Sequence, residues 1–133
     1  MMIPVTLVAA GVLCVMFVGL SFFVVKGRMK TLTALGDGGH ELMQRRIRAQ
    51  GNFAEYVPLA LIVMGLLEMY GGNPTLLAIL AVLLVIGRVL HAYSLLRSEP
   101  AGRGMRGRQV GMMLTFGVLG VMGVWAVGMG LSF

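Results

Sequence analysis

Four stretches of the chain carry no charged side chain: residues 1–25, 56–67, 69–87 and 109–133. A helix needs about 20 mainly apolar residues to cross a bilayer. Inside lipid the backbone must satisfy its own hydrogen-bonding groups, so such segments are helical. The pattern therefore predicts an all-α membrane protein, a four-helix bundle with helices near residues 3–25, 44–70, 74–96 and 109–132.

The composition agrees with this pattern. Apolar residues make up 58% of the 133 residues and charged residues 12%, whereas soluble domains carry about a quarter charged residues. A single cysteine excludes a disulfide scaffold. The length fits one domain over residues 1–133, and the first stretch lacks the basic start of a signal peptide, so we expect it to remain as a helix.

The basic residues are distributed unevenly along the chain. Ten of the eleven flank the first and third connections, and none lies at either terminus or in residues 69–73. By the positive-inside rule we expect an inner-membrane protein with both termini outside and the two basic connections in the cytoplasm. This one-sided charge accounts for the net +6 without a nucleic-acid partner. The ten residues are Lys26, Arg28, Lys30, Arg45, Arg46, Arg48, Arg97, Arg103, Arg106 and Arg108.

A polar stripe is predicted on the second helix. At 100° per residue, Arg48, Asn52, Glu55 and Tyr56 all fall with Arg45 in a sector of about 100°. If this helix leaves the hydrocarbon near residue 70, the opposite boundary lies about twenty residues earlier, near residue 50. The stripe therefore descends from the basic side into the membrane.

The third helix, which runs the opposite way, brings Arg88 to a depth similar to that of Glu55. A charge inside the membrane costs several kcal/mol unless it is paired, so we expect Glu55 and Arg88 to pair. His91 follows one turn after Arg88 on the same face. Pro58 leaves a backbone carbonyl free and can bend the second helix.

The polar set as a whole has more cationic donors than acceptors. A simple helix clamp by an ion pair is one interpretation, but the excess favours an anionic ligand with carboxylates, which guanidinium groups bind bidentately. We expect no metal site. For the glycines of the fourth helix we expect a packing role, because small residues let membrane helices approach closely; these are Gly111, Gly117, Gly120, Gly123, Gly128 and Gly130.

At these residues the sequence resembles the MAPEG superfamily, membrane-associated proteins in eicosanoid and glutathione metabolism. Residues 48–58, RAQGNFAEYVP, resemble its signature R-A-x-x-N-x-x-E-x-x-P. Residues 87–91, GRVLH, resemble its second signature, and residues 108–111, RQVG, its arginine-led start of helix four. The short loops are most similar to the small bacterial branch, close to microsomal glutathione transferases. Where eukaryotic relatives often have a tyrosine four residues after the histidine position, this chain has Leu95, with Tyr93 on a different face.

The resemblance implies a homotrimer with glutathione as co-substrate, bound between subunits near the cytoplasmic face. The expected glutathione-binding residues are Arg48, Asn52, Glu55, Tyr56, Arg88, His91 and either Lys26 or Arg28. Arg108 would approach the thiol, as the catalytic residue at the start of a helix, with Arg103 and Arg106 as competing positions. A lipophilic electrophile would enter from the bilayer into a groove lined by the first and fourth helices, for conjugation or peroxide reduction.

Two other functions remain open from the sequence. A non-catalytic lipid-binding scaffold has the same fold, because fold alone does not decide catalysis. A small proton-coupled exporter would also need four helices and an intramembrane carboxylate. However, neighbouring arginines would hold Glu55 ionised, and a carrier carboxylate must cycle.

Overall fold

The computed structural model describes residues 2–97 and 104–132. It has four helices in order: α1 (Pro4–Thr31), α2 (Glu41–Met69), α3 (Pro74–Leu96) and α4 (Gly104–Gly130). All four are long and apolar enough to cross a membrane, and the described residues contain no strand. The predicted all-α, four-helix fold is confirmed.

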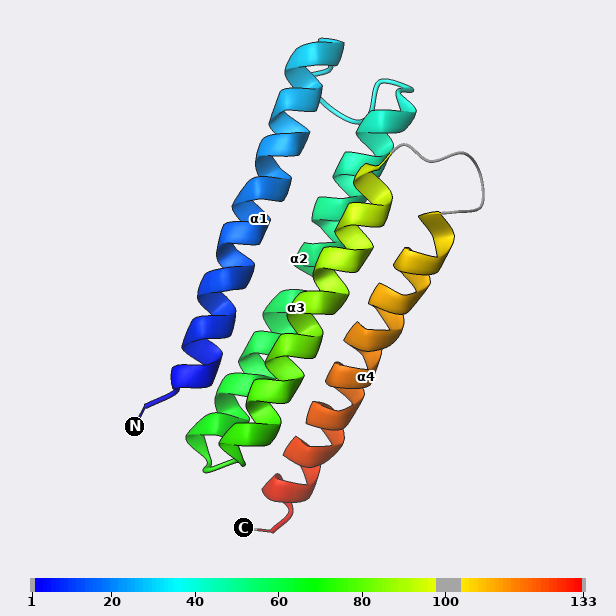
Figure 1. Cartoon of the computed structure of the whole chain (residues 1–133). Coiled ribbons are helices and arrows are strands. Elements are labelled where there is room, and N and C mark those ends of the chain that lie inside the picture. Colours follow the sequence, from blue (N-terminus) through cyan, green and yellow to red (C-terminus); the bar gives the residue numbers. More distant parts are fainter. Residues whose placement is uncertain (1, 98–103, 133) are drawn as a thin grey trace.

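The helices form an up-and-down bundle with α2 and α3 at its centre (Figure 1). Each of these two contacts all the other helices, whereas α1 and α4 do not touch each other within the described residues. Both termini and the α2–α3 connection lie at one end. The α1–α2 connection, the last turn of α3 and the first turn of α4 lie at the other, which we call the basic end.

The first turn of α1 is held by a carboxylate from α2. Pro4 occupies the first helical turn, and no side chain of α1 itself caps this end. Instead Glu68 accepts the Val5 N–H at 2.9 Å and the Thr6 N–H at 2.8 Å, one on each carboxylate oxygen. Because helix N-termini leave N–H groups unsatisfied and attract negative charge, this contact stabilises α1 against α2.

The predicted end of the first helix was wrong. The hydropathy signal stops at Lys26, but α1 continues to Thr31 and ends at Leu32 in the left-handed conformation, with φ 52°. Lysine, arginine and methionine are good helix formers, so the helix continues beyond the apolar segment into the polar region. Hydropathy locates the membrane boundary and not the end of the helix.

Two other helices begin earlier in the sequence than predicted. α2 begins at Glu41 instead of residue 44, and α4 begins at Gly104 instead of residue 109. Arg108 is therefore the fifth residue of α4, where its N–H can bond to the carbonyl four residues earlier. The sequence predicted that Arg108 begins this helix. In the structure Arg108 lies one turn inside α4, and its backbone N–H is not a free donor.

The α1–α2 connection is a turn cluster, as the glycines predict. Gly36, Gly38 and Gly39 have φ of 66°, 59° and 77°, values that only glycine adopts at little cost. The Gly39 N–H donates to the Asp37 carboxylate at 2.9 Å, and this hydrogen bond lowers the pKa of Asp37. Arg28 also donates to the carbonyl of Ala34 at 2.9 Å, which fixes the connection to the end of α1.

The glycines of α4 fall into two groups. Gly111 lies so close to α3 that an added Cβ would be 2.6 Å from the Gly87 carbonyl oxygen, so packing is confirmed there. The other five glycines predicted to pack have no atom of another element within 4 Å of such a Cβ; they are Gly117, Gly120, Gly123, Gly128 and Gly130. A side chain at these five positions would thus meet no other element in the described part of this chain, so a need for close helix packing does not explain them.

Candidate functional site

The centre of the candidate site is Arg88, a cation in the interior of the bundle. Its side chain lies on α3 with only 1% of its surface exposed. Nη1 donates to the Asn52 side-chain oxygen on α2 at 2.8 Å, and Nη2 lies 3.5 Å from the Gly111 carbonyl and 3.6 Å from the Met112 sulfur on α4. Three helices thus converge on one guanidinium.

The close approach of α3 and α4 explains this convergence. Gly87 and Gly111 face each other, and a Cβ on either would meet backbone or side-chain atoms of the other helix. Without side chains at these two positions, the backbone of α4 comes within reach of Arg88. Neither glycine is interchangeable with a larger residue.

Arg88 is incompletely neutralised. Nε is buried and has no hydrogen-bond partner among the described residues, and no described carboxylate lies within ion-pair distance of the group. A guanidinium has five donors and binds carboxylates in a planar fork. Because the hydrogen bonds of this buried cation go only to neutral oxygens and a thioether, it retains capacity for an anion.

The predicted Glu55–Arg88 pair is wrong. Glu55 accepts from Arg48 at 3.0 Å, two turns away on the same helix. On α2 the Asn52 side chain points about 60° away from that of Glu55 around the helix axis, and it is Asn52 that faces α3. The Arg48–Glu55 pair lies instead on the outer surface, with the two side chains 56% and 48% exposed.

Tyr56 and His91 complete the interior part of the stripe. The Arg88 guanidinium lies 5.9 Å from the centre of the Tyr56 ring, which makes an edge contact at 5.4 Å with Phe116 of α4. His91 is buried one turn beyond Arg88, against Gly111. Arg48, Arg88 and Arg108 are all near enough to act electrostatically on His91, so three helices contribute positive charge to one region.

The other basic residues predicted to bind glutathione or its thiol differ in exposure and in their contacts. Arg106 and Arg108 are exposed in the first turns of α4, and Arg103 lies outside the described residues. Lys26 is exposed and has no hydrogen bond or ion pair with the described residues, whereas Arg28 is engaged by the α1–α2 connection. Of the two alternatives on α1, Lys26 is thus the side chain whose donors are not used within the described chain.

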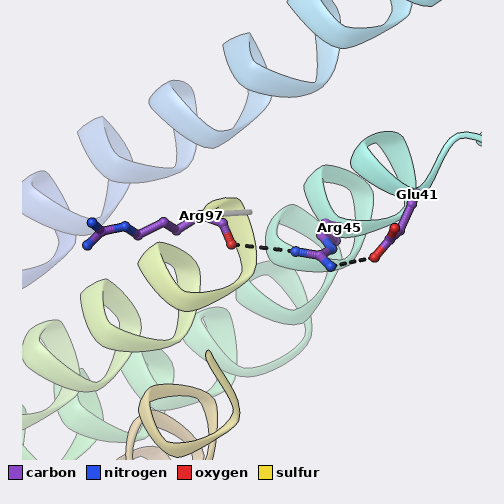
Figure 2. A network of polar contacts seen from close by, with 3 residues as sticks. All are labelled: Glu41, Arg45 and Arg97. Atoms are coloured by element: carbon purple, nitrogen blue, oxygen red, sulfur yellow. Dashed lines mark hydrogen bonds and ion pairs between the residues drawn. The ribbon is translucent and has the colours of Figure 1, made fainter. Parts of the chain in front are cut away.

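Arg45 links elements at the basic end instead of joining Arg88. Its guanidinium pairs with Glu41, one turn earlier on α2, and lies 3.5 Å from the Arg97 carbonyl at the end of α3 (Figure 2). It therefore fixes the last turn of α3 to the first turn of α2. The position of Arg45 on the predicted stripe is correct, but its contacts are structural.

Sequence reasoning missed three contacts from α4. Gly111, Met112 and Phe116 touch Arg88 or Tyr56. Gly111 and Met112 follow Arg108 by about one turn and Phe116 by about two turns, and this spacing was available as a signal, since residues three or four apart share a helix face. The sequence could not show that this face of α4 meets α2 and α3.

The comparisons with known proteins agree with this architecture. A model of the MAPEG family matches residues 6–128. The inner membrane protein YecN of Escherichia coli K12 is 41% identical over 73 residues, which cover 55% of this chain and 56% of that protein. YecN of Escherichia coli O6:H1 matches to the same extent. The chain thus spans a little over half the length of the curated relatives that it matches.

Proposed function

This chain belongs to the MAPEG family, and from that premise we propose that it is a membrane-bound enzyme that uses glutathione against lipophilic electrophiles. The observation that supports this most is the buried Arg88, which has no carboxylate partner among the described residues. Glutathione carries two carboxylates and one ammonium group, so its net charge complements the site. The relatives are named as inner membrane proteins, and we propose the same location, with the basic end in the cytoplasm.

In this proposal the polar stripe of α2, together with the residues of α3 beside it, binds the tripeptide. Arg88 and Arg48 bind carboxylates, Asn52 and Tyr56 orient them, and Glu55 accepts from the ammonium while still paired with Arg48. His91 supports Arg88 from the same helix. Lys26 of a neighbouring subunit adds a further cation.

Arg108 is proposed to stabilise the thiolate. A thiol with an ordinary pKa near 8.5 is mostly protonated at neutral pH, and lowering that pKa by about 2 units needs about 2.7 kcal/mol. Because the backbone N–H of Arg108 lies inside α4, the contribution of Arg108 to this stabilisation comes from its guanidinium charge. The thiolate sulfur then forms a bond to the electrophilic carbon, and the leaving group departs with its electron pair. With a peroxide, two glutathiones are oxidised to the disulfide while the peroxide becomes an alcohol and water.

The same proposal includes a homotrimer. The Glu55 side chain is 48% exposed, and the depth estimate places it within the hydrocarbon, where an exposed charge is costly unless another surface covers it. Contact with a neighbouring subunit would cover Arg48 and Glu55. It would also bring α1 of one subunit to α4 of the next, which a single chain does not do, and so create the groove for the electrophile.

The test is ultraviolet difference absorbance at the thiolate band during glutathione titration of the purified full-length protein. We expect a saturable signal that is lost in Arg108→Ala. Arg106→Ala tests the competing position, because Arg106 is also exposed in the first turns of α4; loss of the signal in that variant alone would assign the thiolate contact to Arg106. Glutathione binding without a thiolate signal would support the non-catalytic scaffold. Absence of binding would contradict the glutathione assignment and make vesicle proton-flux assays of the exporter alternative the next step.

A further inference from the structure

A second feature of the bundle lies on the other side of α3, where that helix faces α1. Between the two helices an apolar groove follows most of their length. Towards the termini it is lined by aliphatic side chains such as Val8 and Val82, with an open volume of about 500 Å³. Towards the basic end it continues past Gly19, Leu20 and Val89, with an open volume of about 610 Å³.

The two parts of the groove differ in how they end. The part near the termini has only proline, alanine, valine and isoleucine in its lining. The part near the basic end finishes at Tyr93, in the last turn of α3, and at Arg97, which directly follows the helix. Arg97 donates to the Tyr93 hydroxyl, and its guanidinium lies 5.5 Å from the centre of the Tyr93 ring. The groove is thus apolar along its length and cationic at one mouth.

This mouth is fixed in place by contacts that do not involve Arg88. The Arg97 carbonyl lies 3.5 Å from Arg45 of α2, which in turn pairs with Glu41 (Figure 2). In Figure 2 the Arg97 side chain extends away from Arg45, so Arg45 holds the Arg97 backbone, while the guanidinium of Arg97 lies at the Tyr93 ring.

The depth of the mouth matches a lipid headgroup. α3 has 23 residues and is about 35 Å long, slightly more than the hydrocarbon thickness of about 30 Å. Arg97 follows its last residue and therefore lies at headgroup level. Tyrosine and arginine are residues that concentrate at this level, and basic pockets between membrane helices bind anionic headgroups.

The lining of the groove near the basic end suits a hydrocarbon chain. From Met16 to Phe23 it covers about 11 Å of α1, and the side chains there are apolar.

We propose that the α1–α3 groove binds an anionic phospholipid of the leaflet at the basic end. One acyl chain lies along Gly19, Leu20 and Val89, and the phosphate contacts Arg97 beside the Tyr93 hydroxyl. Gly19 leaves room for the chain, because no atom of another element lies within 4 Å of where its Cβ would be. This site does not share a residue with the glutathione site and does not depend on that assignment.

The test is native mass spectrometry of the purified full-length protein, incubated with equal amounts of phosphatidylglycerol and phosphatidylcholine that carry the same acyl chains. We expect the anionic lipid to be retained over the zwitterionic one by about fivefold, the effect of one cation near the membrane surface. Arg97→Gln should bring the ratio close to one, while Lys30→Gln, an exposed cation outside the groove, should leave it unchanged. A parallel arm with oleate distinguishes a free fatty acid from a phospholipid.

The groove itself is tested by a matched pair of glycine variants. Gly19→Leu places a side chain in the groove and should reduce retention of both lipids, whereas Gly11→Leu, on an exposed face of α1 outside the groove, should not. Circular dichroism establishes that both variants remain helical. Equal retention of the two lipids by the wild type, equal retention by the two glycine variants, or preferential retention of oleate would each overturn the proposal. If Gly19→Leu altered the oligomeric state and not lipid retention, the occupant would be a second copy of this chain.

Discussion

Two charged side chains on neighbouring helices differ in whether the bundle supplies their hydrogen-bond and charge partners. Glu68, near the end that carries the termini, has both carboxylate oxygens occupied by N–H groups of α1. Arg88, towards the basic end, has its Nε unsatisfied and no carboxylate partner among the described residues. The first charge is neutralised by the fold itself, and its role is structural. The second needs something that the described chain does not supply, which is what a binding site for an anion requires.

The largest effect is expected from removing the unsatisfied cation. Arg88→Met should weaken glutathione binding by about 100-fold, or about 2.7 kcal/mol, because a buried charge partner of the ligand is lost. The melting temperature should change little, since relief of a buried charge offsets the lost hydrogen bond to Asn52. Calorimetric titration and thermal unfolding in detergent measure the two quantities.

The matched control for that variant is Arg46→Met. Arg46 is a guanidinium of α2 that donates to the Phe23 carbonyl and lies outside the polar stripe. It should leave glutathione affinity unchanged. Binding by Arg88→Met within about threefold of the wild type would mean that Arg88 is a structural residue like Glu68.

A smaller effect is expected from giving Arg88 a carboxylate within the chain. Asn52→Asp places a negative charge at the oxygen that now accepts from Arg88 at 2.8 Å. Affinity for glutathione should fall about tenfold, because the internal carboxylate competes with the ligand for the cation. Unfolding should require a higher temperature. An affinity equal to that of the wild type would show that the ligand does not use the charge of Arg88.

Loss of the Glu68 carboxylate charge should lower the free energy of unfolding and leave glutathione binding unchanged. Glu68→Gln keeps one acceptor for α1 but loses the negative charge at its N-terminus, which should cost about 1 kcal/mol of the free energy of unfolding. Hydrogen exchange at the Val5 and Thr6 amides should accelerate, while glutathione affinity remains that of the wild type. A parallel loss of affinity would indicate that the two ends of the bundle are coupled.

The smallest effect concerns Asp37, an exposed carboxylate that neither holds two helices together, as Glu68 does, nor lies at the proposed binding site, as Arg88 does. The hydrogen bond from Gly39 lowers the pKa of Asp37 below the usual value of 3.8. Its contribution to the turn is therefore present above that value and is lost as the pH falls through the lowered pKa. The Gly39 amide resonance should follow this titration by NMR, with glutathione affinity at neutral pH unchanged in Asp37→Asn. A midpoint at or above 3.8 would show that the hydrogen bond does not favour the ionised form.

Much of the fold could be predicted from the sequence, and the reason is the bilayer. Charge-free runs of sufficient length report directly on membrane spans, so all four helices were found. Their ends were not, because Lys26, Arg28 and Lys30 lie outside the hydrocarbon but still form helix. Hydropathy contains no information on where such an extension stops.

The candidate site was predictable only as a set of residues and not as a set of contacts. The helical spacing grouped Asn52 and Tyr56, and the depth estimate brought Arg88 to their level, in agreement with the contacts seen. The partner of Arg88 depends on how α2 is rotated relative to α3, which a single helix pattern does not determine. For that reason Glu55 was assigned to Arg88, although it lies on the outer surface with Arg48.

The most direct test of the central claim compares glutathione with its diethyl ester, in which both carboxylates are blocked, by calorimetric titration of the full-length protein. If the cationic Arg88 makes the site, glutathione binds saturably and the diester binds at least about 100-fold more weakly, since two charge-assisted contacts are lost. Equal affinity of the two compounds would contradict the claim, because the site would then recognise glutathione without using its negative charge.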